Sequence, residues 1–229
     1  MKSKYLILAA SLLGMAAANA ATISWSGTIY TVSGSFGQTL NLGQFDQSGT
    51  LILAENVGGG ALSFDGISWS AGTIANMGAG GGTFSGFHEN VPTSNTLLAR
   101  DGAYGGNGNA GTVNLNGLTV GATYRIQALV YDGRGDTGIP GRTVTFDSTN
   151  LGQYAFGVSG VTWGNGLLAT GTFVADATSQ GFTNEAFTSG GASRGGMLNA
   201  LTVYQTAVPE TSAVMLGGIG MLSLLRRRR

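Results

Sequence analysis

Short runs in which apolar and polar residues alternate recur along residues 21–207, and glycine or asparagine separates them. Ile23 and Trp25 alternate in this way near the start, and Val144 and Phe146 do so later. No window keeps the 3.6-residue spacing of an amphipathic helix. Glycine, at 41 of 229 residues, is also costly within helices. The pattern therefore predicts an all-β fold.

We expect about ten strands in a single domain. They are predicted at residues 22–32, with a bulge at Gly27, and at residues 38–45, 49–57, 61–69, 96–100, 112–115, 122–131, 142–147, 154–161, 166–176 and 197–205. Asn116 and Gly117 form a strong tight-turn pair. Residues 71–95, which leave room for one short strand, and residues 101–111 are expected to be loops.

Two architectures fit about ten strands rich in small residues. One is a jelly-roll-like β-sandwich, in which two antiparallel sheets pack face to face. The other is a β-solenoid, which should repeat its apolar positions about every 20 residues. The sequence contains no such repeat, so the jelly roll is the favoured prediction.

The first 20 residues have the parts of a secretory signal peptide. Lys2 and Lys4 precede an apolar run at residues 5–15. Ala18 and Ala20 provide the small residues that a signal peptidase requires, so cleavage is expected before Ala21. The partners that follow from this prediction are the Sec machinery and a signal peptidase.

The last 22 residues have three parts in a fixed order. A turn of Val208, Pro209 and Glu210 comes first, and an uncharged, largely apolar run at residues 211–225 follows it. The chain then ends in four arginines, Arg226, Arg227, Arg228 and Arg229. As a helix the run would be about 22 Å long, a minimal membrane span, and the arginines would stay on the cytoplasmic side.

This tail resembles the PEP-CTERM sorting signal of Gram-negative, exopolysaccharide-producing bacteria. The resemblance covers about a tenth of the chain, and Thr211 replaces the second proline of the motif. It implies processing by an exosortase-like enzyme, at least transient attachment to the inner membrane, and a final place at the cell surface or outside the cell. The alternative is a short tail anchor that is not processed.

Removing both ends changes the charge of the chain. The whole chain balances 11 basic against 11 acidic residues, but residues 21–207 keep five arginines and ten acids, a net charge of 5 − 10 = −5. Nucleic acid is not expected as a partner, because phosphate binding needs clusters of basic residues. The absence of cysteine excludes thiol catalysis and cysteine-bound metals.

The segment at residues 118–132 places Leu118, Gly121 and Tyr124 in the Leu-x-x-Gly-x-x-Tyr order of many extracellular β-sandwich domains. In those domains the tyrosine hydroxyl bonds to nearby backbone. Together with residues 141–146 and 198–203, the segment is similar to the galactose-binding-like sandwiches often found ahead of PEP-CTERM tails. Such sandwiches bind sugars, assist enzymes or act as scaffolds, so this resemblance does not decide the function.

The sequence contains no catalytic motif. Its one histidine, His88, stands beside Glu89 in a predicted loop, and no Gly-x-Ser-x-Gly is present. Carboxylate pairs for glycoside hydrolysis can be drawn in many arbitrary ways, so a glycoside hydrolase is a distant alternative. We expect a protein that is not an enzyme and needs no cofactor.

Two loops contain the remaining candidate chemistry. Asp132 and Asp136 are candidate calcium ligands, but the loop lacks the Asp-x-Asp-x-Asp-Gly spacing, so an acidic hairpin loop is the favoured interpretation. Trp163, Asn165 and Tyr104 lie in glycine- and asparagine-rich settings that could form a sugar-binding platform, although core packing is the favoured interpretation of Trp163. Trp25 and Trp69 are expected in the core. The sequence thus predicts an exported structural or adhesive protein, with an exopolysaccharide-binding module as the alternative.

Overall fold

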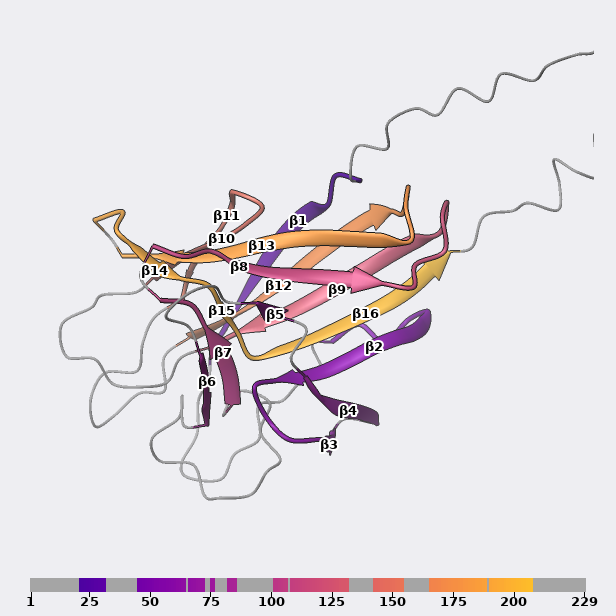
Figure 1. The fold of residues 1–229 in the computed structure, drawn as a ribbon, viewed down its shortest axis with the longest axis horizontal. Coiled ribbons are helices and arrows are strands. Elements are labelled where there is room, and N and C mark those ends of the chain that lie inside the picture. The colour runs from indigo at the N-terminus through magenta and orange to yellow at the C-terminus, as the bar shows by residue number, and fades with distance from the viewer. Residues whose placement is uncertain are drawn as a thin grey trace, which may run out of the picture.

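The computed structural model describes residues 21–31, 45–64, 66–72, 75–76, 82–85, 101–106, 108–131, 142–154, 165–188 and 190–207. These residues form strands, turns and connecting segments, and no helix occurs among them. Figure 1 shows the strands as two large layers with a smaller sheet at one end. The predicted all-β class is therefore confirmed.

The larger layer is a seven-stranded sheet. Its strands, in spatial order, are β1 (Ser24–Thr31), β12 (Asn165–Val174), β9 (Thr123–Val130), β16 (Ala200–Ala207), β2 (Thr50–Val57), β4 (Ile67–Gly72) and β3 (Leu62–Phe64). Every neighbouring pair is antiparallel except β2 and β4, which are parallel. This mostly antiparallel arrangement is that of a sandwich and differs from the stacked parallel coils of a solenoid.

The second layer and the small sheet complete the fold. The second layer contains β11 (Thr149–Tyr154), β10 (Arg142–Phe146), β13 (Ser179–Phe187), β8 (Gly111–Asn116) and β5 (Ala75–Asn76), with β14 (Ser193–Gly195) paired to β13. The small sheet contains β15 (Met197–Leu198), β7 (Asp101–Tyr104) and β6 (Gly82–Ser85). The third sheet is not part of the two-sheet sandwich that the sequence predicts.

The main core lies between the two large sheets. Alternate residues of β9 face it, among them Tyr124 and Ile126, and Val113, Phe146 and Phe182 face it from the other sheet. The predicted inward positions of β9 and β10 are confirmed. The Tyr124 hydroxyl accepts a hydrogen bond of 2.8 Å from the Thr119 backbone N–H, as the Leu-x-x-Gly-x-x-Tyr segment predicts.

A second apolar cluster covers the outer face of the seven-stranded sheet. Leu129 and Tyr131 point to it from the end of β9, and Trp69 meets the Phe45 ring edge-on at 5.4 Å between ring centroids. Trp69 is buried, as predicted. Trp25 is only half-buried, and its ring packs against Phe146 and Phe182. The centre of the larger sheet is therefore covered on both faces.

Several strand predictions are wrong. β1 pairs with β12 without a register shift, so no bulge occurs at Gly27. Glycine is needed there because a Cβ atom would lie 2.6 Å from the Leu151 carbonyl oxygen. The strand predicted at residues 61–69 is the hairpin of β3 and β4, turned at Gly66 with φ +74°. β7 occupies a predicted loop, and β13 was not predicted at all.

Other predictions fall outside the described residues. These are the strand at residues 96–100, nearly all of the strands at residues 38–45 and 154–161, the signal peptide before Ala21, and the tail from Val208. Ala21 itself is described and packs against the main core. Among the described residues no helix has the length and apolar character that a membrane crossing requires.

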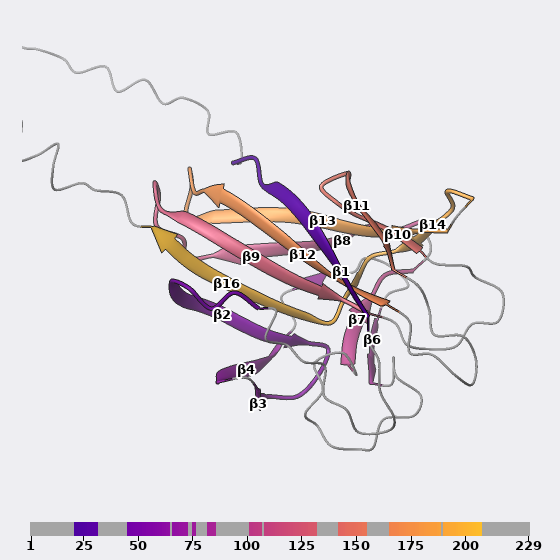
Figure 2. The ribbon, with the colours of Figure 1, turned by 180° about the vertical axis from the view of Figure 1, so that it is seen from behind.

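The domain begins and ends at the same end of the larger sheet. Ser24 lies opposite Thr172, Thr172 opposite Arg125, and Arg125 opposite Tyr204. The first residue of β1 and the C-terminal part of β16 therefore lie in one row across four strands. Three strand spacings separate them, about 14 Å. Figures 1 and 2 show the start of β1 and the arrowhead of β16 at this end, with β6 and β7 at the other.

Candidate functional site

The predicted sugar-binding residues that are described lie on different sheets. Tyr104 ends β7, opposite Met197 and Gly82, and the residue is 37% exposed. Asn165 begins β12 opposite Thr31. Both positions lie at the end of the domain away from Ala207. Trp163, the proposed centre of the platform, falls outside the described residues.

The candidate calcium ligands Asp132 and Asp136 also fall outside the described residues, as do His88 and Glu89. The same holds for the cleavage residues Ala18 and Ala20 and for the sorting residues. Within the described ranges no group of three or more His, Asp and Glu side chains could hold a metal ion.

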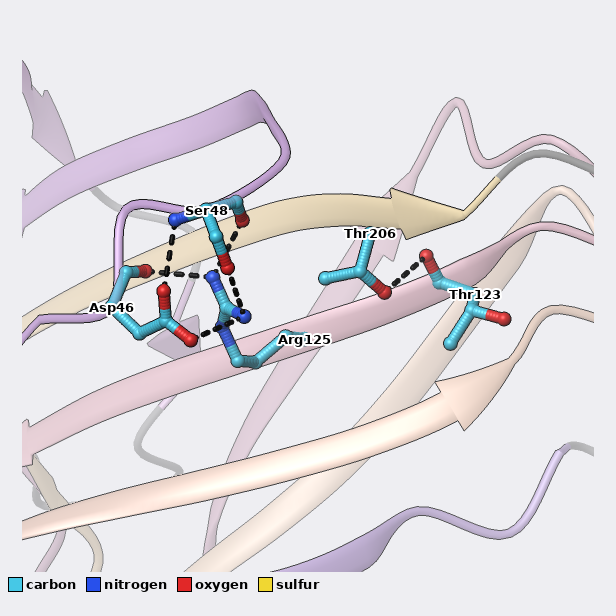
Figure 3. Close-up of polar contacts among 5 residues, drawn as sticks. All are labelled: Asp46, Ser48, Thr123, Arg125 and Thr206. Atoms are coloured by element: carbon cyan, nitrogen blue, oxygen red, sulfur yellow. Dashed lines mark hydrogen bonds and ion pairs between the residues drawn. The ribbon is translucent and has the colours of Figure 1, made fainter.

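Among the residues that the structure describes, an extensive polar cluster centres on Arg125, which the sequence did not single out (Figure 3). Arg125 lies on β9 and points to the outer face of the sheet. Its Nη1 lies 2.7 Å from Asp46 Oδ2 and donates to Ser48 Oγ at 3.1 Å. Its Nη2 donates to the backbone carbonyl oxygens of Asp46 and Ser48, each at 2.7 Å. The guanidinium also stands 5.4 Å from the centre of the Tyr204 ring.

This cluster fastens the segment that enters β2. Two of the four guanidinium contacts are to backbone carbonyls, which fix the path of the chain whatever side chains it bears. Ser48 N–H donates to Asp46 Oδ1 at 2.9 Å and closes the turn from the other side. Because its η nitrogens are already engaged and its side chain is 11% exposed, Arg125 is a structural clamp.

The pKa of Asp46 lies below its ordinary value of 3.8. The main cause is the hydrogen bond from the Ser48 backbone N–H, and the Ser48 side chain lowers the pKa further. Partial burial opposes these effects, and the positive charge of Arg125 adds to them. The Asp46 carboxyl is therefore ionised throughout the neutral range.

A second polar centre joins three elements at the end away from Ala207. The Asn199 side chain accepts a 2.7 Å hydrogen bond from Tyr131 N–H and donates to the Asp101 carbonyl oxygen at 3.0 Å. Its backbone N–H donates to Leu129 O, and its carbonyl accepts from Val57 N–H. Asn199 thus ties β9, β7 and β2 together where β15 leads into β16. This asparagine positions β7, and with it Tyr104, against the sandwich.

Comparison with known proteins identifies no family. No family model matches the chain, and no curated protein matches it either. Among solved structures it is similar to the ANXUR1 extracellular domain from Arabidopsis thaliana, with 13% identity, a TM-score of 0.48, and coverage of 68% of this chain and 48% of that one.

Two further structures show a lower similarity. A plant receptor-like kinase, FER, is 12% identical with a TM-score of 0.38, over 68% of this chain and 49% of the other. The exo-beta-1,3-galactanase of Phanerochaete chrysosporium, solved with galactose, is 14% identical with a TM-score of 0.29, over 61% and 31%. This chain spans about half the length of the two plant structures.

Proposed function

We propose that this chain is an exported, non-catalytic protein of structural or adhesive type, held at the cell surface or in the extracellular matrix. A jelly-roll-like sandwich is its working domain, and the tail at residues 208–229 is its sorting signal. The observation that carries the proposal is the order of the three tail parts: the Val208-Pro209-Glu210 turn, an uncharged run and four arginines.

The arrangement of the domain ends supports this function. The chain enters the sandwich at Ala21 and leaves it at Ala207, at the same end of the larger sheet. A domain held by its tail would therefore stand with this end toward the membrane. The small sheet and Tyr104 would then face outward, where a matrix component could reach them. Residues 21–207 have a net charge of −5 and no lysine. This charge suits a protein outside the cell better than one that binds nucleic acid.

Fractionation of the host cells tests the proposal. The full chain is expected with the membrane or cell-surface fraction, whereas a chain that lacks residues 208–229 should be released into the periplasm or the medium. A full chain found soluble in the cytoplasm, or a deletion without effect on its distribution, would refute the proposal.

Mass spectrometry of the mature C-terminus then separates processing from simple anchoring. Processing by an exosortase-like enzyme should leave a chain that ends near Pro209 and Glu210, whereas a tail anchor should retain Arg226 to Arg229. The variant Thr211→Pro restores the second proline and is the matched control. It should increase the processed fraction if a motif-reading enzyme acts on the tail, and it should change nothing if the tail is only an anchor.

Exopolysaccharide binding is the second candidate, favoured by the exposure of Tyr104 at the end away from Ala207. An exposed aromatic ring offers the apolar face of a sugar a surface to stack on. Titration of the wild type with a panel of polysaccharides should shift tryptophan fluorescence and the melting temperature, and Tyr104→Ala should weaken the shift. Val174→Ala, which removes an exposed side chain at the other end, is the control. An unchanged wild type across the panel would exclude this function.

A further inference from the structure

β1 is the outermost strand of the seven-stranded sheet (Figure 2). β12 pairs with one side of it along all eight residues, from Ser24 opposite Thr172 to Thr31 opposite Asn165. No described strand pairs with its other side. The lateral backbone N–H and C=O groups of an edge strand can accept a further strand, so natural edges usually carry features that prevent such pairing.

β1 lacks four such features: a charged residue, a proline, a bulge and a short length. Its sequence, Ser-Trp-Ser-Gly-Thr-Ile-Tyr-Thr, contains no charged residue and no proline. Its register is unbroken by a bulge. Eight residues also make it long for an edge strand, since shortness is itself a protection.

The strands at the other three ends of the two large sheets, β3, β5 and β11, are protected. β3 has three residues and β5 has two. β11 contains Gly152 with φ +113°, and the pairing of β10 with β11 shifts register between Thr143 and Thr145. Such irregular edges receive a new strand poorly. Among the described strands, the long, regular and uncharged edge is therefore β1.

The sandwich packs against the inner face of β1 at Trp25 and Gly27 and leaves the outer face exposed. At Gly27 the Leu151 carbonyl lies so close that a Cβ atom would be 2.6 Å from it. Trp25 packs on Phe146, and its Nε1 donates to Asp147 Oδ2 at 2.9 Å. The side chains that alternate with these inner positions, including Ser24, Ser26 and Thr28, are exposed. An edge already held in strand geometry loses little further entropy when a partner strand is added.

We propose that β1 pairs antiparallel with β1 of a second copy of this chain, so that the larger sheet continues across a two-fold axis. The second copy is the occupant because antiparallel pairing makes one strand complementary to itself around such an axis. When odd-numbered residues of one β1 pair with odd-numbered residues of the other, and even with even, the face of β1 that carries Trp25 points toward the core in both copies. β1 contains no charged residue, so the pairing places no like charges opposite each other, although the domain as a whole is acidic. The nearby Asp147 carboxylate is already bonded to Trp25 and to Thr183 N–H.

This self-pairing would extend the structural role proposed above. Only its biological setting, at the cell surface, rests on that proposed function. A tail at one end of each domain and a shared edge along the side would link neighbouring copies laterally in a surface layer. The pairing can be measured on the isolated full chain, so its failure leaves the fractionation result unaffected.

Disulfide trapping tests the pairing directly, because the chain contains no cysteine. Ser26→Cys, Thr28→Cys and the double variant place thiols on the exposed face of β1 near the expected axis. Cα atoms of opposed antiparallel residues lie about 4.5–5.5 Å apart, within disulfide range. Thr172→Cys, on β12 and exposed, is the control. Two β12 strands in such a pair would be about 14 Å apart, beyond disulfide reach.

We expect mild oxidation to crosslink at least one β1 variant into a dimer and to leave Thr172→Cys monomeric. Light scattering of the full chain in detergent should show a dimer, and Thr28→Lys should lower the association constant about tenfold or more, since like charges would then oppose each other. Thr172→Lys should have no effect, and circular dichroism checks that each variant is folded. A monomeric wild type would overturn the proposal. Crosslinking of the β1 variants no greater than that of Thr172→Cys would also overturn it. A dimer whose association constant does not change in Thr28→Lys would overturn it too, because the contact would then lie in the tail.

Discussion

Replacement of Arg125 by methionine tests which contacts make this residue a clamp. Methionine keeps an unbranched apolar stem beneath Tyr204 and removes every guanidinium contact. The lost contacts are two hydrogen bonds of 2.7 Å to the carbonyls of Asp46 and Ser48, one hydrogen bond to Ser48 Oγ, the ion pair with Asp46, and the weak contact of the guanidinium with the Tyr204 ring. The carbonyl bonds are expected to carry most of the stabilisation.

The magnitude follows from how exposed each partner is. The Asp46 side chain is 55% exposed, so water screens the ion pair and its contribution is about 0.5 kcal/mol. Hydrogen bonds from a charged donor contribute about 1.5 kcal/mol each at the lower end of their range, which gives about 3 kcal/mol for the two carbonyls. Relief from burying the guanidinium offsets part of this sum. We expect Arg125→Met to lower the free energy of unfolding by about 2 kcal/mol.

Urea denaturation followed by tryptophan fluorescence measures this loss, and Asp46→Asn is the matched variant. Asparagine keeps the oxygen that accepts from Ser48 N–H and removes only the charge. Its cost should be about 0.5 kcal/mol and should shrink at high salt, whereas the cost of Arg125→Met should hardly change. Equal losses for the two variants, or a strong salt dependence of the Arg125→Met loss, would refute the view that the backbone carbonyls carry the clamp.

Three further outcomes are expected. Tyr124→Phe should lower the free energy of unfolding in urea by about 1 kcal/mol, because it removes the 2.8 Å hydrogen bond from Thr119 N–H without changing the packing of the ring. An unchanged denaturation midpoint would contradict this and show that water replaces the bond fully. Gly58→Ala should destabilise the fold more than Gly117→Ala does. The φ angle is positive at both glycines, but only at Gly58 would the added Cβ meet a backbone carbonyl. Equal melting temperatures of the two variants would contradict this expectation. The lowered pKa of Asp46 favours the ionised, folded form, so its stabilisation is complete above pH 3.8 and is lost as the pH falls through the lower folded-state pKa. Acid titration of the wild type against Asp46→Asn should show this loss only in the wild type.

Strands were predicted most readily where the inward residues are all apolar. β9 and β10 are examples, because Tyr124, Ile126, Val144 and Phe146 alternate without a polar residue among the inward positions. The Tyr124 hydroxyl bond was also predictable, since its partner lies five residues away. Local patterns suffice where both partners are close in sequence.

β13 was missed although it lies in the middle of the second sheet. Its buried positions alternate strictly, but Gln180 and Asn184 fill two of them beside Phe182. A search for apolar alternation does not count such residues as inward. β7 was missed for a related reason, because Gly102 and Ala103 are too small to mark a buried face. Burial in both strands is imposed by neighbours distant in sequence.

The clamp shows the same division between local and long-range information. An arginine within the apolar segment at residues 122–131 signals a buried charge that requires partners. The sequence does not say which partners, because Asp46 and Ser48 lie 79 and 77 residues away from Arg125. The sugar-platform prediction also depends on which residues the fold brings together: Tyr104 and Asn165 lie on separate sheets at the same end of the domain, and Trp163 falls outside the described residues.

The placement of β16 determines how the domain would resist mechanical load. β16 leads directly into the tail and lies between β9 and β2, antiparallel to both. Tension between an anchored tail and a matrix gripped at the far end would act along the strand axis. It would have to shear two ladders of hydrogen bonds together, whereas a tail leaving from an edge strand could be peeled off one bond at a time. If residues 208–229 anchor the chain as proposed, its exit through the interior strand β16 would place the load on the part of the sheet best able to bear a pull.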